Sequence, residues 1–268
     1  MKLFFRKTGE GKPLIILHGL FGMSDNWMTL SKQFAENGFA CYAVDQRNHG
    51  RSPHSDEFSF KSMADDLLEL MTEEQLISAN IIGHSMGGKT AMYFASMHPE
   101  KTEKLVVSDI APKKYEPHHN HELNAIQSVD LNTIHSRKEA EVLLRTSLHV
   151  ESTVQFLLKN LYWKVDANEG PVNSADDSEE KLAWRFNLDA IAKHPNAVGE
   201  ALPANFHFDK PTLFLRGEKS GYISDLDIPG IKKHFPKAEI KTISNSGHWI
   251  HADNPKEFME VTLHFLQS

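Results

Sequence analysis

The chain has 268 residues, of which 40% are hydrophobic, and it carries a formal net charge of −7 at pH 7. This composition suits a folded protein with a sizeable core, and the absence of a basic stripe or a long apolar run argues against nucleic acid as a partner and against stable membrane insertion. Because there is no signal-peptide pattern and the single cysteine, Cys41, lies in an apolar run, we expect a cytoplasmic protein with a buried core thiol.

Short apolar runs alternate along the chain with amphipathic stretches, which is typical of an α/β protein with a mostly parallel sheet covered by helices. The expected strands are residues 14–17, 40–44, 80–82, 105–107, 212–215 and 239–243. Apolar residues at helical spacing predict helices between them, the first beginning at Ser24 or Asp25 and ending before Gly38. Phe258 and Phe265 indicate a closing C-terminal helix.

The alternation stops between residues 113 and 206, where helical patterns appear with polar interruptions. The expected helices are residues 122–128, 137–148, 152–161 and 179–194, with turn chemistry such as Asn168-Glu169-Gly170-Pro171 between them. Strand and helix alternation resumes afterwards, so we expect one domain rather than two. Its core would be residues 1–112 and 207–268, and residues 113–206 would form an inserted helical lid.

The pentapeptide Gly83-His84-Ser85-Met86-Gly87 lies between an expected strand and an expected helix. This spacing is typical of a nucleophile elbow, in which a tight turn exposes the central serine and the flanking glycines avoid a steric clash. The helix that follows points its N-terminus at Ser85, where backbone donors and the helix dipole favour an oxyanion. The sequence therefore predicts Ser85 as a nucleophile.

A serine nucleophile needs a base, and His248 has the right position among the histidines. It follows the last expected strand and precedes the C-terminal helix, so it should lie at the same edge of the sheet as Ser85. The cluster His118, His119 and His121 lacks nearby cysteine or paired carboxylate ligands, and we interpret it as a solvated loop rather than a metal site. No metal is expected.

The acid that orients the base is expected at the same edge. In many proteins of this architecture it follows the penultimate strand, but Ser220 occupies the position where aspartate is usual. Asp109 directly follows the strand after the elbow helix and is the favoured candidate. Asp225 and Glu218 remain alternatives, and Asp109 can also be read as a turn or helix cap.

The oxyanion needs two backbone donors, and the residue after the serine, Met86, supplies one of them. The second is expected from the glycine-flanked turn that follows the first parallel strand, where Leu20 is favoured over Phe21. Aromatic residues of the lid, Phe156 and Trp163, are expected to line an acyl pocket with Phe21 and Trp249, although packing within the lid is the simpler explanation for any one of them.

These residues resemble the α/β-hydrolase superfamily over essentially the whole chain. The resemblance rests on His18-Gly19, the run from Asp45 to Ser52, the elbow and Gly247-His248. More narrowly, residues 47–50, the run 108–112 and the absence of aspartate from residues 217–223 resemble the YbfF-type esterases and the related abhydrolase-domain proteins of mitochondria. The resemblance implies a serine esterase acting on acyl esters or acyl thioesters, with its acid after the sixth strand. It also implies that Arg47 and His49 belong to a structural turn.

The predicted function is that of a carboxylic-ester hydrolase that acts on a small-molecule acyl ester, or on an acyl-CoA thioester, through Ser85, His248 and Asp109. Neither a metal nor an organic cofactor is required. Two alternatives are a carbon-carbon bond hydrolase of the same fold, against which the missing acid at Ser220 counts, and a catalytically idle ligand-binding protein. Reaction of Ser85 with a fluorophosphonate would separate an enzyme from the idle protein.

Overall fold

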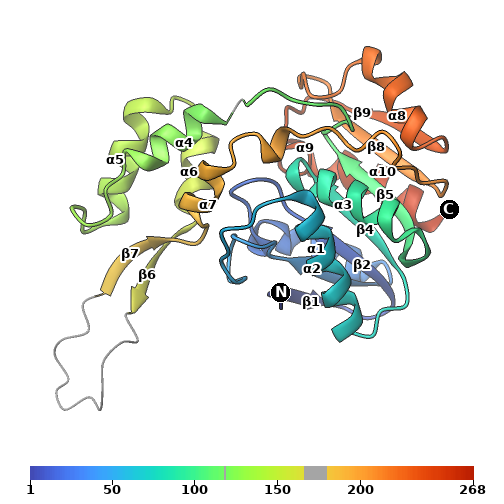
Figure 1. Ribbon diagram of the computed structural model, residues 1–268, viewed down its shortest axis with the longest axis horizontal. Coiled ribbons are helices and arrows are strands. Elements are labelled where there is room, and N and C mark those ends of the chain that lie inside the picture. Colours follow the sequence, from blue (N-terminus) through green and yellow to red (C-terminus); the bar gives the residue numbers. More distant parts are fainter. Residues whose placement is uncertain (118, 166–179) are drawn as a thin grey trace.

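The computed structural model describes residues 1–117, 119–165 and 180–268, and its centre is a seven-stranded sheet (Figure 1). The strands of this sheet are β1 (Phe5–Thr8), β2 (Lys12–Leu17), β3 (Phe39–Val44), β4 (Ala79–His84), β5 (Thr102–Ser108), β8 (Thr212–Gly217) and β9 (Ala238–Ile243). Their order is β1-β3-β2-β4-β5-β8-β9, with β1 antiparallel to β3 and all other neighbours parallel. The expected parallel sheet and its six strands are confirmed.

The edge strand β1 was not predicted. Its charged residues Arg6 and Lys7 interrupt the apolar pattern that marks a strand, and such residues are common on sheet edges because they discourage pairing with another chain. Strand β1 is held instead by its antiparallel register with β3, which runs from Phe5 opposite Val44 to Thr8 opposite Cys41. Cys41 is fully buried, as expected of a core thiol.

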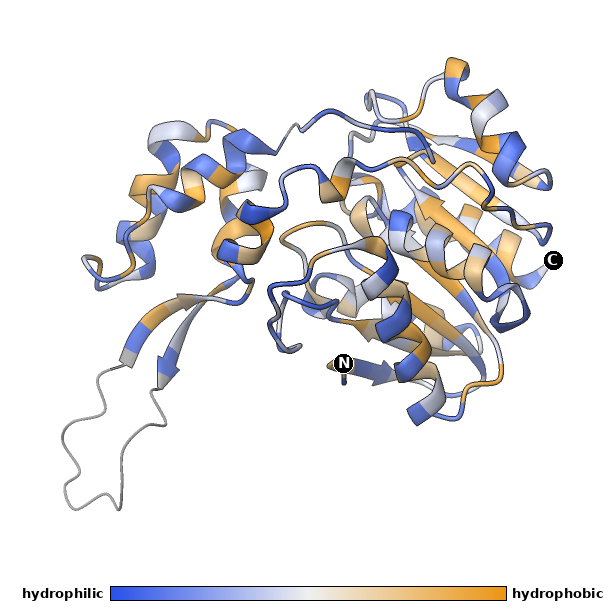
Figure 2. Cartoon of the chain, viewed as in Figure 1, coloured by the Kyte–Doolittle hydropathy of each residue, from blue (hydrophilic) through white to orange (hydrophobic). Residues whose placement is uncertain are grey.

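The helices cover both faces of the sheet. Helices α1 (Met28–Glu36) and α10 (Pro255–Gln267) pack on one face, and α2 (Phe60–Glu73), α3 (Met86–Met97) and α8 (Ile228–His234) pack on the other. Strand β2 shows why successive side chains serve the two faces. Leu14 and Ile16 pack with the hydrophobic residues of α1 and α10, whereas Ile15 and Leu17 pack with those of α2, α3 and α8. Figure 2 shows the resulting hydrophobic strands between more polar helices. Each such side chain contributes about 1.5–3 kcal/mol when fully buried.

The strand order creates one crevice at the carboxyl edge of the sheet. The chain moves outward from β2 to β3, then crosses back to β4 on the other side of β2 and continues to β5, β8 and β9. The loops after β2 and β4 therefore diverge to opposite faces, and ligands of α/β proteins bind at such a switch point. These two loops hold Leu20 and Ser85.

The segment between β5 and β8, residues 113–206, is called the insertion below, and it lies beside the core (Figure 1). Its elements are α4 (Asn120–Gln127), α5 (Arg137–Ser147), α6 (Glu151–Leu158), β6 (Leu161–Val165), β7 (Glu180–Trp184) and α7 (Leu188–Lys193). The two segments that join it to the core, residues 112–115 and 199–202, are called the neck. They pair through Tyr115 N–H to Gly199 C=O at 2.8 Å and Leu202 N–H to Pro112 C=O at 2.8 Å.

The prediction that the insertion is helical throughout was wrong in one place. Helix α6 ends at Leu158, and Leu161 begins the antiparallel hairpin β6–β7 instead of ending a helix. The expected helix over 179–194 is a strand over its first part, and only Leu188–Lys193 is helical. The physical reason is the period of two in β7, where Leu182 and Trp184 are buried. Residues 168–171, where a turn was expected, and Glu179 lie outside the described residues.

Candidate active site

Ser85 stands at a sharp turn between β4 and α3. Its backbone has φ 52° and ψ −117°, a conformation that side-chain-bearing residues seldom adopt and that costs about 1–3 kcal/mol. A Cβ added to Gly83 would lie 2.6 Å from the carbonyl carbon of Gly87, and one added to Gly87 would lie 2.6 Å from the carbonyl oxygen of His18. Only glycine fits at both positions, which is the steric reason for the pentapeptide spacing.

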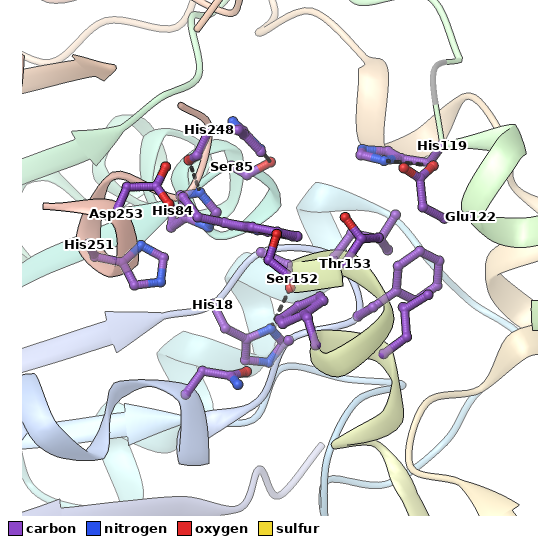
Figure 3. A pocket seen from close by; sticks show the side chains of 18 of the residues that line it. His18, His84, Ser85, His119, Glu122, Ser152, Thr153, His248, His251 and Asp253 are labelled. Atoms are coloured by element: carbon purple, nitrogen blue, oxygen red, sulfur yellow. Dashed lines mark hydrogen bonds and ion pairs between the residues drawn. The ribbon is translucent and has the colours of Figure 1, made fainter. Parts of the chain in front are cut away.

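Ser85, His248 and Asp109 form a continuous chain of hydrogen bonds. The hydroxyl oxygen of Ser85 lies 3.0 Å from Nε2 of His248, and Nδ1 of His248 lies 2.8 Å from Oδ2 of Asp109. With a proton on Nδ1, the imidazole donates to Asp109 and accepts from Ser85, so one neutral tautomer satisfies both bonds. Figure 3 shows Ser85 and His248 together at one end of the cavity.

Asp109 is fully buried directly after β5, and it also has a positive φ of 53°. Its Oδ1 accepts a hydrogen bond from Gly217 N–H at 3.1 Å, and its Oδ2 accepts a second bond from the hydroxyl of Ser220. Burial raises the pKa of Asp109 to about 6, while these two hydrogen bonds act in the opposite direction. The role of Ser220 as a partner of Asp109 was not predicted.

The two alternative acids have other partners. Asp225 is 81% exposed and forms an ion pair with Arg216 at 2.6 Å. Glu218 accepts a hydrogen bond from Asn245 N–H at 2.7 Å. The structure therefore brings Asp109, and neither Asp225 nor Glu218, to His248.

Other histidines surround the site in neutral form. Burial lowers the pKa of His84 to about 3 and that of His18 to about 4. His84 donates through Nε2 to the backbone carbonyl of His248 at 2.8 Å, and His18 accepts from Gln46 N–H at 3.0 Å. These two rings therefore support backbone segments, and His248 is the ring placed to exchange a proton with Ser85.

The loop after β2 approaches Ser85 closely, since a Cβ added to Gly19 would lie 3.3 Å from Cβ of Ser85. Within the described residues, neither Leu20 N–H nor Met86 N–H donates to a protein acceptor. Met86 is also the first residue of α3, where the helix dipole favours negative charge. A side chain of the insertion steadies this loop, because Asn160 Nδ2 donates to the carbonyl of Phe21 at 2.8 Å. Asn160 was not predicted from the sequence.

A cavity of about 390 Å³ opens beside Ser85 and is lined by the core and the insertion. Phe21, Phe156 and Trp249 all line it, and the rings of Phe156 and Trp249 are 5.2 Å apart. Trp163 does not line it: this residue lies on β6 and is 48% exposed. The structure thus brings three of the four expected pocket residues together and leaves Trp163 outside.

The charges at the cavity have one sign. Among the described residues that line it there is no Lys or Arg, whereas Glu122 and Asp253 are both present. Figure 3 shows Glu122 on the side opposite Ser85 and His248. A ligand that carries several negative charges would find no fixed cation here to balance them.

Three further expectations from the sequence concern features away from the serine. Over residues 1–117, 119–165 and 180–268, no three His, Cys, Asp or Glu side chains are grouped to hold a metal ion, and His118 lies outside these ranges. Arg47 donates to both oxygens of the Asp66 carboxylate, at 2.6 and 2.9 Å, which ties the turn after β3 to α2. In the part of the chain that the structure describes, no helix has the length and apolar character needed to cross a membrane.

Comparison with known proteins gives concordant matches. A family described as "alpha/beta hydrolase fold" matches residues 12–255. The chain is 34% identical to "Esterase YbfF" of Escherichia coli over 96% of this chain and 94% of that protein. It is 36% identical to "sn-1-specific diacylglycerol lipase ABHD11" of Danio rerio over 98% of this chain and 81% of that protein. The solved structure titled "Marine microorganism esterase" is 44% identical, covers 99% of both chains and superposes with a TM-score of 0.91.

Proposed function

The chain belongs to the α/β-hydrolase family, and we propose that it is a serine carboxylic-ester hydrolase with Ser85 as nucleophile, His248 as base and Asp109 as acid. One observation carries this proposal: the unbroken hydrogen-bonded chain from Ser85 through His248 to the buried Asp109, at 3.0 and 2.8 Å. A catalytically idle protein has no need to hold a serine on a strained backbone against an imidazole. The similar proteins named esterase and lipase support the same conclusion.

Acylation begins when the hydroxyl oxygen of Ser85 attacks the ester carbonyl carbon and Nε2 of His248 takes the hydroxyl proton. The imidazolium that results is stabilised by the carboxylate of Asp109 at Nδ1. The negative charge on the former carbonyl oxygen is bound by the backbone N–H groups of Met86 and Leu20. When the tetrahedral intermediate collapses, His248 returns its proton to the leaving alcohol, and an acyl-Ser85 ester remains.

Deacylation repeats these steps with water. His248, neutral again, takes a proton from a water molecule whose oxygen attacks the acyl carbonyl. The same two backbone donors bind the second oxyanion. Collapse returns the proton to Ser85 and releases a carboxylic acid, so each turnover consumes one ester and one water and needs no group beyond the protein's own residues.

The substrate class follows from the cavity. Its aromatic lining suits an acyl chain, and the absence of Lys and Arg from its described lining favours an ester of an uncharged alcohol over a thioester of coenzyme A, which carries several phosphate charges. A thioester of an uncharged thiol would react by the same chemistry. The insertion supplies Val150, Thr153 and Phe156 to the cavity wall, so it serves as a lid that selects the acyl group.

The test is hydrolysis of p-nitrophenyl butyrate together with labelling by a fluorophosphonate, in the parent and in Ser85→Ala. We expect stoichiometric labelling of the parent, no labelling of the variant, and a loss of at least about 10⁴-fold in kcat/KM. Ser108→Ala is the matched control, since the buried Ser108 hydroxyl has no hydrogen-bond partner among the described residues and lies one strand away. A Ser85→Ala enzyme within tenfold of the parent would overturn the proposal.

The preference for an uncharged alcohol is tested with the same acyl group on two leaving groups. We expect kcat/KM for ethyl butanoate to exceed that for butyryl-CoA, although the thioester is intrinsically no less reactive. A higher kcat/KM for butyryl-CoA would contradict the argument from the cavity charges and leave the role of Ser85 intact.

A further inference from the structure

The neck that joins the insertion to the core is tied to the helix that carries the nucleophile. Lys89 lies one turn beyond Ser85 in α3 and is fully buried. Its Nζ donates to the carbonyl of Lys113 at 2.6 Å and to the carbonyl of Glu200 at 2.7 Å, one in each segment of the neck. Lysine is rarely buried without a carboxylate partner, and among the described residues Lys89 forms no ion pair.

The neck is also tied to the base. The hydroxyl of Tyr115, in the first segment of the neck, donates to the carbonyl of Tyr222 at 2.7 Å and accepts from Ala111 N–H at 2.8 Å. The ring of Tyr222 stacks on the imidazole of His248, with 3.8 Å between centroids and 12° between planes. Nζ of Lys89 lies 5.3 Å from the centroid of the Tyr115 ring, so the hydrogen bonds made by Lys89 and those made by Tyr115 meet at the neck.

We propose that Lys89, Tyr115 and Tyr222 are positioning residues that set the imidazole of His248 against Ser85 according to the placement of the neck. This proposal rests on the proposed function of Ser85 and His248. The imidazole must hold two hydrogen bonds in one plane, and the face of Tyr222 fixes that plane from the side. A tyrosine face also attracts a cationic ring, so the contact favours the imidazolium that forms during the reaction.

The placement of the insertion should therefore affect proton transfer between Ser85 and His248. Neither Lys89 nor any residue of the neck lines the cavity, so of these residues only Tyr222 is placed to touch a substrate. A displacement of about 1 Å at a reacting group can cost about 100-fold in rate. Changes at the neck should therefore lower kcat more than they raise KM, which is the signature that distinguishes positioning from substrate binding.

The first test removes one hydroxyl with Tyr115→Phe and measures p-nitrophenyl butyrate hydrolysis by folded enzyme. We expect kcat to fall about 10-fold with KM within about twofold. Tyr93→Phe is the matched control, since Tyr93 is a buried tyrosine of α3 near the neck whose hydroxyl makes no hydrogen bond to a described residue. Equal kcat values for Tyr115→Phe and the parent would overturn the proposal.

A spectroscopic readout separates positioning from general loosening of the fold. In the parent, we expect the stacked Tyr222 ring to shield the Cε1–H proton of the His248 imidazole and to move its NMR resonance upfield of the free value. Tyr115→Phe should move this resonance downfield, and Tyr93→Phe should leave it in place. An unmoved resonance in Tyr115→Phe would show that the hydroxyl does not act through the stack.

A double-mutant cycle tests the order of the link. If Tyr115 acts through the ring of Tyr222, then Tyr115→Phe should have no further effect on kcat in a Tyr222→Leu background. Additive losses in the double variant would mean independent effects and would overturn the link.

Lys89→Met completes the test by removing both hydrogen bonds of Nζ while keeping an unbranched, flexible side chain at the buried position. Lys104→Met is the control, because Lys104 likewise donates to two backbone carbonyls, those of Phe265 and Leu266, at the end of α10 far from the neck. Both variants should unfold at lower urea concentration, but only Lys89→Met should lose kcat, by about 10-fold. Equal kcat losses in the two would overturn the proposal for Lys89. If the parent neither labels with fluorophosphonate nor hydrolyses the ester, it is the proposed function that fails.

Discussion

In the core, Ser85 and Asp109 each come directly after one of two neighbouring parallel strands, and each has a φ close to 50°. Their backbone N–H groups extend the sheet, from Ser85 to the carbonyl of Ser108 at 3.0 Å and from Asp109 to that of Leu215 at 2.8 Å. In the insertion, Phe156 and Asn160 reach the same site through side-chain contacts alone. The core thus fixes the chemistry by backbone geometry, whereas the insertion shapes the cavity by contacts that single side chains can alter.

The strongest way to test this difference is Asp109→Asn. Because the backbone sets the position of residue 109, the variant should keep its place beside His248 and lose only the charge that stabilises the imidazolium and that fixes the tautomer of the neutral imidazole. We expect kcat for p-nitrophenyl butyrate to fall by about 10⁴-fold. Circular dichroism should show unchanged secondary structure.

Asp225→Asn and Glu218→Gln are the controls for this experiment, since both residues have partners other than His248. Each should stay within a few-fold of the parent. If Asp225→Asn lost activity and Asp109→Asn kept it, the acid would lie in the loop after β8 and the argument from backbone geometry would be wrong.

The same difference explains what could be predicted from the sequence. The elbow is a local feature: a tight turn requires glycine at positions 83 and 87, and the steric rule can be recognised in five residues. Asp109 could be proposed because strand ends in a parallel sheet share one edge. The strand order β3-β2-β4 places Leu20 and Ser85 together for the same reason.

Apart from β1, whose charged residues hide the strand pattern, the missed features depend on contacts between residues that are distant in the sequence. The hairpin β6–β7 pairs Leu161 with Trp184 across 23 positions, and even its nearest pair, Val165 and Glu180, is 15 positions apart, so the short turn that marks most hairpins in a sequence is missing. The contact of Asn160 with Phe21 joins residues 139 positions apart. In the sequence Ser220 indicates only a missing acid, and its hydrogen bond to Asp109 depends on the folding of residues 111 positions apart. Sequence periodicity carries no signal for such pairs.

The insertion is tested by comparing Phe156→Ala with Trp163→Ala. Phe156 lines the cavity and contacts Trp249, so its truncation should change the preference among p-nitrophenyl acetate, butyrate and octanoate by about 1–3 kcal/mol in relative kcat/KM. Trp163 is half exposed on β6 and should leave the preference unchanged.

The controls for this comparison are internal, because each variant is measured with all three esters. A uniform loss in Phe156→Ala would mean that the ring supports the insertion without selecting the acyl chain. A changed preference in Trp163→Ala would show that β6 approaches the substrate during turnover, contrary to its position here.

The smallest expected effect concerns stability in acid, and it should arise in the core alone. Burial lowers the pKa of His18 to about 4 and the pKa of His49 and His84 to about 3, against about 6.5 when unfolded. The unfolded chain therefore binds more protons between about pH 3 and 6.5, so stability is complete above pH 6.5 and is lost as the pH falls. Within that range, each of these histidines should lower the free energy of unfolding by about 1 kcal/mol for every pH unit of acidification. Asp109 has the opposite effect. Its pKa is raised to about 6 in the folded chain, so the folded chain binds this one proton more tightly and offsets part of the stability that the histidines lose in acid.

Urea unfolding at pH 7.5 and 5.5 measures the loss, and His49→Leu isolates one contribution. His49 donates through Nδ1 to the carbonyl of Arg47 at 3.0 Å, and its Nε2 is buried without a partner among the described residues, so protonation there would bury an unpaired N–H. The difference between the two pH values should shrink by about 1 kcal/mol in His49→Leu. His135→Gln replaces an exposed histidine of the insertion and should leave the difference between the two pH values unchanged. If His135→Gln shrank the difference and His49→Leu did not, acid sensitivity would lie in the insertion and the division between the two regions would be wrong.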